Sequence, residues 1–247
     1  MSSQYVLQQL ATLDISKTTG LDNISAKFLK MSSHLMSILL CHICNLSIRK
    51  SNFPSIFKLA KVIPVFKNKG SRNDVSNYRP IAILPLVSKI LERHMKNHLM
   101  NFLNKYNLLY LLQSGFRLNH SCQTALTFMI DRWLKAVDKG ELIGAAFLDF
   151  AKAFDLLDHE LLLHKLQKYR FSYTSLQWFS SYLNDRRQIV SISNTFSDLQ
   201  QVKSGVPQVS VLIKPVLFLI FINDLTQIIT LILFSDGEKQ ALYNQNT

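Results

Sequence analysis

Two aspartates that each follow a hydrophobic run are the residues of this sequence best suited to chemistry. Asp149 lies in the segment LIGAAFLDFAKAFDLLDH, and Asp236 follows the run TLILFS. Carboxylates at the ends of neighbouring buried strands would lie close together and repel each other unless cations separate them. Mg²⁺ prefers such oxygen ligands, and a pair of metal ions stabilises both the attacking and the leaving oxygen of a phosphoryl transfer. As a pair the two residues therefore indicate polyphosphate chemistry, whereas either one alone is typical of a turn or a helix cap.

The charge of the chain indicates a polyanionic partner. Its 247 residues include 28 Lys and Arg against 16 Asp and Glu, which gives a net charge of +12. Ten of the cations and only two of the acids lie between Lys58 and Lys105. Nucleic acid is the first candidate for such a partner and an anionic membrane surface the second, although a solvated basic face would give the same count.

No segment of the sequence is expected to cross a membrane. The longest apolar stretch begins at Val211, and Lys214, Pro215, Asn223 and Asp224 interrupt it. Each piece is therefore shorter than the roughly 20 apolar residues that a membrane-spanning helix needs. No signal peptide precedes the three cysteines, so we expect a reduced compartment, cytoplasmic or nuclear, and no secretion.

Two pairs of potential metal ligands have simpler interpretations. Cys41 and Cys44 form a single CxxC inside an apolar helical run, which is typical of core thiols and lacks the second pair of a zinc site. His94 and His98 are spaced i, i+4, but no glutamate lies beside the first, so a solvated helix face is the simpler prediction.

Hydrophobic periodicity and turn residues predict alternating helices and strands, an α+β layer fold. Leu59–Phe66 is expected as a strand in which Pro64 marks an edge or a bulge, and Leu142–Phe150 as a strand buried on both faces. Asp158 is placed to cap the helix that follows it. The expected helices cover residues 23–50, 84–105, 121–139, 159–169, 173–183 and 211–225. A polar loop is expected over 67–80, strands over 188–193 and 198–204, and a strand, turn and strand over 230–243 with Asp236 in the turn.

Six segments resemble, in order, the motifs of the reverse transcriptase of non-LTR (LINE-type) retrotransposons. The first is FPSIFKLAKVIPVFKNKG, which begins at Phe53, and the last is LFSDG, which begins at Leu233. Between them stand NYRPIAILPLVSKILER, QSGFRLNHSCQTAL, AAFLDFAKAFDLLDHELLLHKL, and SYLNDRRQIVSI with SGVPQVSVLIKPVLFLIFINDL. Together the segments extend over nearly the whole chain.

This resemblance implies a right-hand polymerase fold of fingers and palm, with a ferredoxin-like antiparallel palm sheet packed on helices. It implies a helical N-terminal extension over 1–50 and a reverse transcriptase domain over 51–247, with fingers at about 51–139 and palm at about 140–247. The family's activity is RNA-directed DNA polymerisation, in which dNTPs are added to a primer 3′ end by two-metal phosphoryl transfer. The implied partners are an RNA template, a DNA primer and dNTPs, with Mg²⁺ or Mn²⁺ as cofactor. No membrane partner and no particular oligomeric state are implied.

The resemblance also assigns roles to individual residues. Asp149 and Asp236 would be the catalytic metal ligands, and Phe150, beside the nucleotide, would lend its backbone carbonyl to a metal. Phe154 would lie under the sugar and exclude a 2′-hydroxyl, because a bulky ring clashes with the added oxygen; without the motif, Phe154 is typical of core packing. The other nucleotide-binding residues would be Lys67 and Arg79, which hold the triphosphate, and Gln208, which lines the nucleotide pocket.

Three positions depart from the family's motifs and predict an impaired copy. Gly237 replaces the second aspartate of the family's F-A-D-D, and Val209 replaces the glycine of P-Q-G, where a β-branched side chain crowds the approach to the nucleotide. One extra residue near Lys214 shifts the register at the start of a buried helix. The chain also stops ten residues after Gly237, so the thumb is expected to be absent and the palm incomplete.

Three interpretations of function remain open from the sequence. The first is an RNA-directed DNA polymerase, whose activity would disappear in Asp149→Ala. The second is a catalytically dead remnant of a mobile element that still binds nucleic acid through its basic segment, with a steep dependence on salt. The third is a poorly folded remnant without function, which would melt broadly and without cooperativity.

Overall fold

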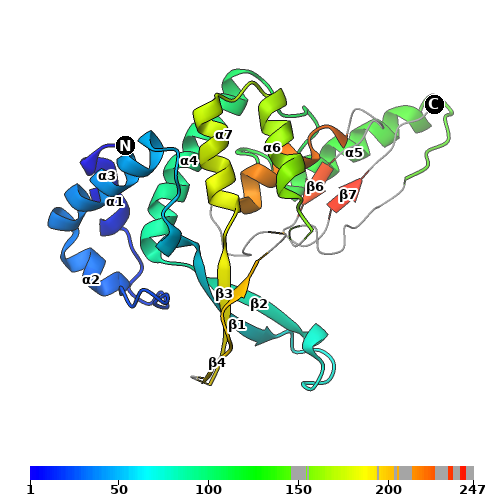
Figure 1. Ribbon diagram of the computed structural model, residues 1–247. Coiled ribbons are helices and arrows are strands. Elements are labelled where there is room, and N and C mark those ends of the chain that lie inside the picture. The colour runs from blue at the N-terminus through cyan, green and yellow to red at the C-terminus, as the bar shows by residue number, and fades with distance from the viewer. Residues whose placement is uncertain are drawn as a thin grey trace. The chain divides into compact units, whose positions relative to one another are not determined.

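The computed structural model describes residues 1–145, 154, 156–193, 195–202, 205, 213–225, 233–235 and 240–242 (Figure 1). The chain divides into two units. The first unit comprises Met1–His98 and Phe154–Lys214, and the second comprises Leu99–Ala153 and Pro215–Thr247. Helix α4 (Leu86–Lys105) contains the division between His98 and Leu99 and confirms the helix predicted over 84–105.

Three helices with serine residues at their starts form the N-terminal part of the first unit. In α1 (Ser3–Ala11) the Ser2 hydroxyl accepts a hydrogen bond from the Tyr5 N–H, as is usual for a helix cap. Ser25 caps α2 (Ala26–Met31) in the same way, and α3 (Ser33–Arg49) follows directly after Ser32. The helical prediction for 23–50 is therefore confirmed with a division at Ser32, and α1 is a further helix.

A five-stranded mixed sheet belongs to the first unit. The 3-10 turn η1 (Ser55–Lys58) leads into β1 (Leu59–Phe66), which pairs antiparallel with β2 (Tyr78–Ile83) and parallel with β3 (Arg187–Ile192). Two short strands, β4 (Thr195–Phe196) and β5 (Gln200–Gln201), pair antiparallel with β3. The structure is thus a mixed arrangement of helices and sheet. The strand predicted over 59–66 is confirmed, and of the strand predicted over 198–204 the described residues 198–202 form a strand only at β5.

The prolines of the β1–β2 hairpin explain where the sheet ends. Pro64 lies opposite Pro80, beyond Val62, which is the last residue of β1 that pairs with β3. Because neither proline has an N–H, the two can face each other only at a non-hydrogen-bonded position, where an N–H would point away from the partner strand. Among the strands that the structure describes, that side of β1 is unpaired at Pro64. The prediction that Pro64 marks an edge is confirmed for this part of the strand.

The loop predicted over 67–80 is shorter than expected. It contains the 3-10 turn η2 (Val75–Asn77) and ends there, because Tyr78, Arg79 and Pro80 are the first residues of β2. Proline and polar residues suggested a loop, but the ladder with Pro64, Val65 and Phe66 includes all three positions. The pairing of two prolines is a tertiary feature that composition alone does not reveal.

An aromatic cluster joins the start of β1 to helix α7 (Tyr173–Leu183). Phe53 is 1% exposed, and its ring lies edge-on to those of Trp178 and Tyr182 at centroid distances of 5.6 and 4.9 Å. The Phe53 N–H donates a hydrogen bond to Ser181 Oγ at 2.9 Å. The guanidinium of buried Arg186 lies 4.4 Å from the centroid of the Tyr182 ring. These contacts fix the positions of the two segments that lead into β1 and β3.

Helix α6 (His159–Lys168) begins as the sequence predicts. The Asp158 carboxylate accepts a hydrogen bond from the Leu161 N–H at 2.8 Å and so caps the first turn. Leu162 and Leu166 form its buried face. The capping role of Asp158 and the helices predicted over 159–169 and 173–183 are confirmed.

Helix α5 (Cys122–Val137) of the second unit starts with a capping box formed by Ser121 and Thr124. Further along this helix, Met129 packs with Leu112, Trp133 and Ile143. The helix predicted over 121–139 is confirmed.

The structure contradicts the first half of the strand predicted over Leu142–Phe150. Leu142 is fully exposed, and residues 142–145 have no strand conformation. Only Ile143 of this part packs into a cluster, so apolar composition overestimated the burial of its neighbours. Residues 146–150 lie outside the described residues.

The last described elements are a π turn, a helix and a hairpin. The π turn η3 (Ile213–Leu217) leads into α8 (Phe218–Ile222), within the helix predicted over 211–225. Strands β6 (Leu233–Ser235) and β7 (Gln240–Leu242) pair antiparallel, which confirms the two strands predicted within 230–243; the residues predicted to form the turn lie outside the described residues. No helix in the described ranges is both long enough and apolar enough to cross a membrane.

Candidate active site

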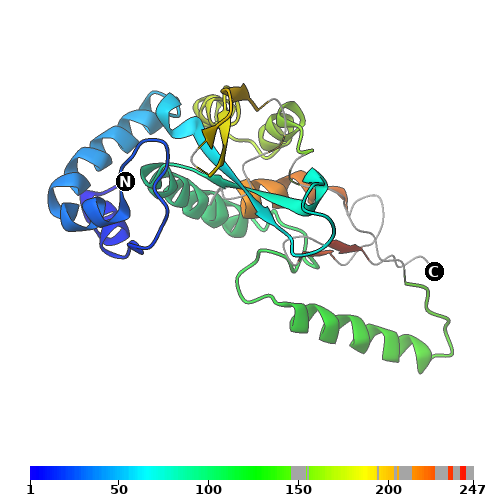
Figure 2. The same ribbon diagram turned by 90° about the horizontal axis from the view of Figure 1, so that it is seen from below.

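The β1–β2 hairpin carries the two predicted triphosphate ligands that the structure describes. Arg79 is exposed on β2 opposite Val65, and Lys67 follows the last residue of β1. The hairpin continues one step beyond the strands, since the Lys67 N–H donates a hydrogen bond to the Asn77 carbonyl at 2.8 Å. The loop lies at the end of the sheet far from α1, α2 and α3 (Figures 1 and 2). The structure therefore brings Lys67 and Arg79 to the same end of one hairpin.

The hairpin loop is folded back on the strand ends by its own contacts. The Lys67 ammonium donates a hydrogen bond to the Ser76 carbonyl at 2.9 Å, and the Arg72 guanidinium lies 5.3 Å from the centroid of the Phe66 ring. The Tyr78 hydroxyl donates a hydrogen bond to the Arg72 carbonyl at 2.9 Å. Exposed cations held on an ordered turn can bind phosphate groups with a smaller loss of entropy than cations on a mobile chain.

Gly70 and Asp74 shape the same loop. Gly70 has a φ of +81°, and an added Cβ would lie 2.6 Å from the Asn77 side chain, so the turn requires glycine. The Asp74 carboxylate accepts hydrogen bonds from the N–H and the hydroxyl of Ser76, and these bonds lower its pKa. Asp74 is therefore ionised at neutral pH, and it is the single acid between Lys67 and Arg79.

A pair of hydrogen bonds joins the segment after Phe154 to the segment before Gln208. The Gly205 N–H donates to the Leu157 carbonyl at 3.2 Å, and His159 Nε2 lies 2.8 Å from the Gly205 carbonyl oxygen. Phe154 itself is a half-buried turn residue three positions before Leu157. The sequence does not single out His159. Its place directly after a helix cap is the only local signal, and its partner Gly205 is 46 residues away.

The predicted catalytic centre is described only at its margins. Asp149, Phe150, Gln208 and Asp236 lie outside the described residues. Strand β6 ends at Ser235, which pairs with Gln240, so Asp236 directly follows a hairpin strand as the sequence predicts. Within the described ranges, no group of three or more His, Cys, Asp or Glu side chains is arranged to hold a metal ion.

The prediction that Cys41 and Cys44 are core thiols is confirmed for Cys44. Cys44 is fully buried, and burial raises its pKa to about 12, which makes it unreactive in the folded protein. Cys41 is half-buried, and its thiol lies 3.3 Å from the Met1 carbonyl oxygen.

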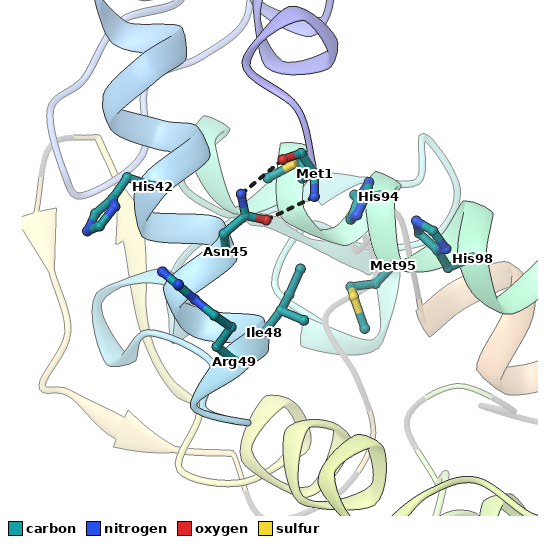
Figure 3. A pocket seen from close by; sticks show the side chains of 8 residues that line it. All are labelled: Met1, His42, Asn45, Ile48, Arg49, His94, Met95 and His98. Carbon is teal, nitrogen blue, oxygen red and sulfur yellow. Dashed lines mark hydrogen bonds between the residues drawn. The ribbon is translucent and has the colours of Figure 1, made fainter.

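The prediction of a solvated face holds for exposed His98 and is wrong for half-buried His94. The His94 ring packs against Tyr5 and His98 at centroid distances of 5.4 and 4.4 Å. Burial, followed by the nearby His98, lowers the pKa of His94 to about 4, so this imidazole is neutral at pH 7. Both histidines line a cavity of about 590 Å³ between α3 and α4 (Figure 3). The other lining residues are Met1, His42, Asn45, Ile48, Arg49 and Met95.

Comparison with known proteins identifies the family. Residues 66–242 match the family model of reverse transcriptase (RNA-dependent DNA polymerase). The chain therefore belongs to the reverse transcriptase family. Within that family it is related to the polymerases of non-LTR retrotransposons, as its motifs indicate.

Two curated relatives come from Drosophila melanogaster. The chain is 32% identical over 220 residues to the probable RNA-directed DNA polymerase from transposon BS, a match that covers 89% of this chain and 24% of that protein. It is 31% identical over 216 residues to the RNA-directed DNA polymerase from mobile element jockey, covering 87% and 23%. The chain thus spans about a quarter of the length of these relatives. A solved structure, the partial Cas6-RT-Cas1–Cas2 complex, aligns with 99% of this chain and 37% of its own at 16% identity and a TM-score of 0.48.

Proposed function

We propose that this chain provides the fingers and palm of an RNA-directed DNA polymerase that adds dNTPs to a primer 3′ end. The observation that carries the proposal is that the family match, residues 66–242, includes every predicted site residue. Those residues are Lys67, Arg79, Asp149, Phe150, Phe154, Gln208 and Asp236. Under this proposal the fingers cover about 51–139 and the palm about 140–247, and the template is RNA.

The β1–β2 hairpin is the triphosphate-binding part of the proposed site. Arg79 is exposed and bears a planar guanidinium, which can bind two phosphate oxygens at once. Lys67 adds a point charge at the same end of the hairpin, and the hydrogen bond from its ammonium to Ser76 limits its motion. The ionised Asp74 carboxylate offsets one positive charge of the loop, and its hydrogen bonds from Ser76 fix its position there.

Asp149 and Asp236 are the proposed metal ligands, with the Phe150 carbonyl as a further oxygen donor. Carboxylate and carbonyl oxygens are the donors that Mg²⁺ and Mn²⁺ prefer. When bound, the metal would supply charge stabilisation for phosphoryl transfer. Phe154 would exclude a 2′-hydroxyl, and Gln208 would line the nucleotide pocket. The hydrogen bonds of Gly205 with Leu157 and His159 support a short distance between the segment after Phe154 and the segment before Gln208.

Primer extension on poly(rA)–oligo(dT) with Mn²⁺ tests this function. Extension by the unmodified chain that is lost in Asp149→Ala and retained in Asp198→Ala, a matched change at an exposed carboxylate, would support the proposal. Extension that survives Asp149→Ala would contradict the assigned catalytic role. Gly237→Asp, alone and combined with Val209→Gly, restores the family's residues and should increase the rate.

A second candidate function is binding of nucleic acid without catalysis, and the changes at Gly237 and Val209 favour it. If the unmodified chain shows no primer extension and the Gly237→Asp, Val209→Gly variant does, the fold is intact and the site is impaired. Binding of an RNA–DNA hybrid should then still weaken steeply as salt rises. Reversing Lys67 and Lys69 to glutamate should lower the salt slope by about 1 for each phosphate that the variant no longer neutralises, whereas Lys139→Glu should leave it unchanged.

A further inference from the structure

Helix α3 turns its large apolar side chains toward solvent. Its buried positions are mostly small or polar, namely Ser33, Ser37, Leu40, Cys44 and Ser47. Its opposite side carries Leu35, Ile38, Leu39, Ile43 and Leu46, which are between 37% and 66% exposed. A helix that packs on one side only normally shows the reverse pattern, with its large apolar residues facing the core.

The orientation of α3 is set by contacts that a simple rotation of the helix would break. The Ser47 hydroxyl donates a hydrogen bond to the Asn52 carbonyl at 2.7 Å and accepts one from Trp178 Nε1 at 3.1 Å. The Met1 carbonyl accepts a hydrogen bond from Asn45 Nδ2 at 2.9 Å (Figure 3). These bonds hold the small side chains of α3 against the rest of the unit, so its aliphatic side remains outside.

Helix α2, which contacts α3, also carries exposed apolar residues. Phe28 and Met31 are 55% and 79% exposed. Together with Leu35, Ile38, Leu39, Ile43 and Leu46 they form what we call the α2–α3 apolar face. Contiguous apolar patches of more than a few hundred Å² are rare on monomeric proteins and mark interaction surfaces.

A cavity adjoins this face. His42 lies one turn from both Ile38 and Leu46 on α3, and it also lines the cavity of about 590 Å³ between α3 and α4 (Figure 3). Ile48, Met95 and Arg49 line the same cavity. A helix lying along α3 could therefore insert a large apolar side chain beside the exposed stripe, as in helix-in-groove recognition.

The charges around the face select the partner. The sequence has no acidic residue from Asn23 to Asn73. Exposed Lys27 and Lys30 lie on α2, and exposed Arg49 and Lys50 lie at the C-terminal end of α3. A second copy of this chain would bring these cations against each other, which costs free energy, whereas acidic side chains would meet them favourably.

We propose that the α2–α3 apolar face binds an amphipathic helix of another protein, with acidic residues beside its apolar stripe. The apolar side chains provide the binding energy, and the flanking cations set the orientation and raise the association rate. This role is independent of polymerase activity.

A pair of designed peptides tests the proposal on the full chain. One helical peptide carries leucines at i, i+3, i+4 and i+7 with glutamates beside them, and the other has lysine at each glutamate position. We expect the acidic peptide to bind at least 10-fold more tightly in fluorescence anisotropy at low salt. Ile38→Ser combined with Leu39→Ser should weaken that binding by about 10-fold or more. Ile130→Ser combined with Leu134→Ser, a matched change at exposed apolar positions of α5, should leave it unchanged.

Several results would overturn the proposal. The proposal is wrong if the two peptides bind with equal affinity or do not bind. It is also wrong if the Ile38→Ser, Leu39→Ser variant binds the acidic peptide as tightly as the unmodified chain. Light scattering that shows a dimer which the same changes dissociate would assign the face to a second copy instead. Cosedimentation with phosphatidylserine vesicles that the same changes abolish would assign it to a membrane surface. Circular dichroism checks that each variant retains its helices.

Discussion

Replacing Phe53 with alanine should destabilise the first unit more than any exposed aromatic substitution. The ring is buried and makes edge contacts with Phe57, Trp178 and Tyr182 at centroid distances of 5.9, 5.6 and 4.9 Å. Truncation of a buried phenylalanine costs about 3–5 kcal/mol, and the aromatic pairs lost with it are worth about 0.5–1.5 kcal/mol each. We therefore expect a loss of about 4 kcal/mol in the free energy of unfolding. In a chain of this size that loss lowers Tm by about 8–16 °C.

Urea denaturation followed by tryptophan fluorescence measures this loss. The chain has two tryptophans, so a Trp133→Phe background leaves Trp178, which contacts Phe53, as the reporter. Phe196→Ala is the matched control, because that ring is 53% exposed and its described ring contact is with the Lys61 ammonium. The control should cost less than about 1 kcal/mol. A loss below about 2 kcal/mol for Phe53→Ala, or one equal to the control, would refute the anchoring role of the cluster.

Three further measurements test local features. Asp158→Ala removes the acceptor for the Leu161 N–H and should cost about 1 kcal/mol in urea denaturation, whereas Asp158→Asn should cost less. Because the pKa of His94 is lowered to about 4 in the folded state, the unfolded chain binds more protons between about pH 4 and the ordinary value of 6.5. The stability that neutral His94 provides is complete above pH 6.5 and decreases as the pH falls toward 4; relative to His94→Gln, the loss should be roughly 1 kcal/mol after allowance for solvent screening. With a thiol reagent, exposed Cys122 should react at once and buried Cys44 only on unfolding, and Cys122→Ser should remove the fast phase.

Local sequence signals predicted the elements whose causes are local. Asp158 marks the start of α6, and short apolar segments between turn residues mark β1 and α7. The parallel pairing of β1 with β3 depends on residues more than a hundred positions apart, for which no local signal exists. The prediction for Leu142 was wrong for the opposite reason: its apolar character predicts burial, but the residue is exposed in the part of the fold that the structure describes.

The same distinction applies to the candidate site. Motif resemblance selected Lys67 and Arg79, and the structure places both at one end of the β1–β2 hairpin. The bond between His159 and Gly205 was not predicted, because it joins two segments that only the folded chain brings together. The roles of Asp149 and Asp236 remain predictions from the motifs.

Motif resemblance predicts one extra residue near Lys214, a change that would act on the fold rather than on the site. The structure has a π turn, Ile213–Leu217, at this position. A π turn closes its hydrogen bond from i to i+5, so it takes up one residue more than an α-helical turn and leaves the following helix in register. Accordingly Phe218, Leu219, Ile220 and Ile222 of α8 remain buried. An insertion that a π turn absorbs need not disturb the core, so the changes at Val209 and Gly237 are the ones that should limit catalysis. That is why restoring these two positions, without removing the insertion, is expected to be sufficient to increase primer extension.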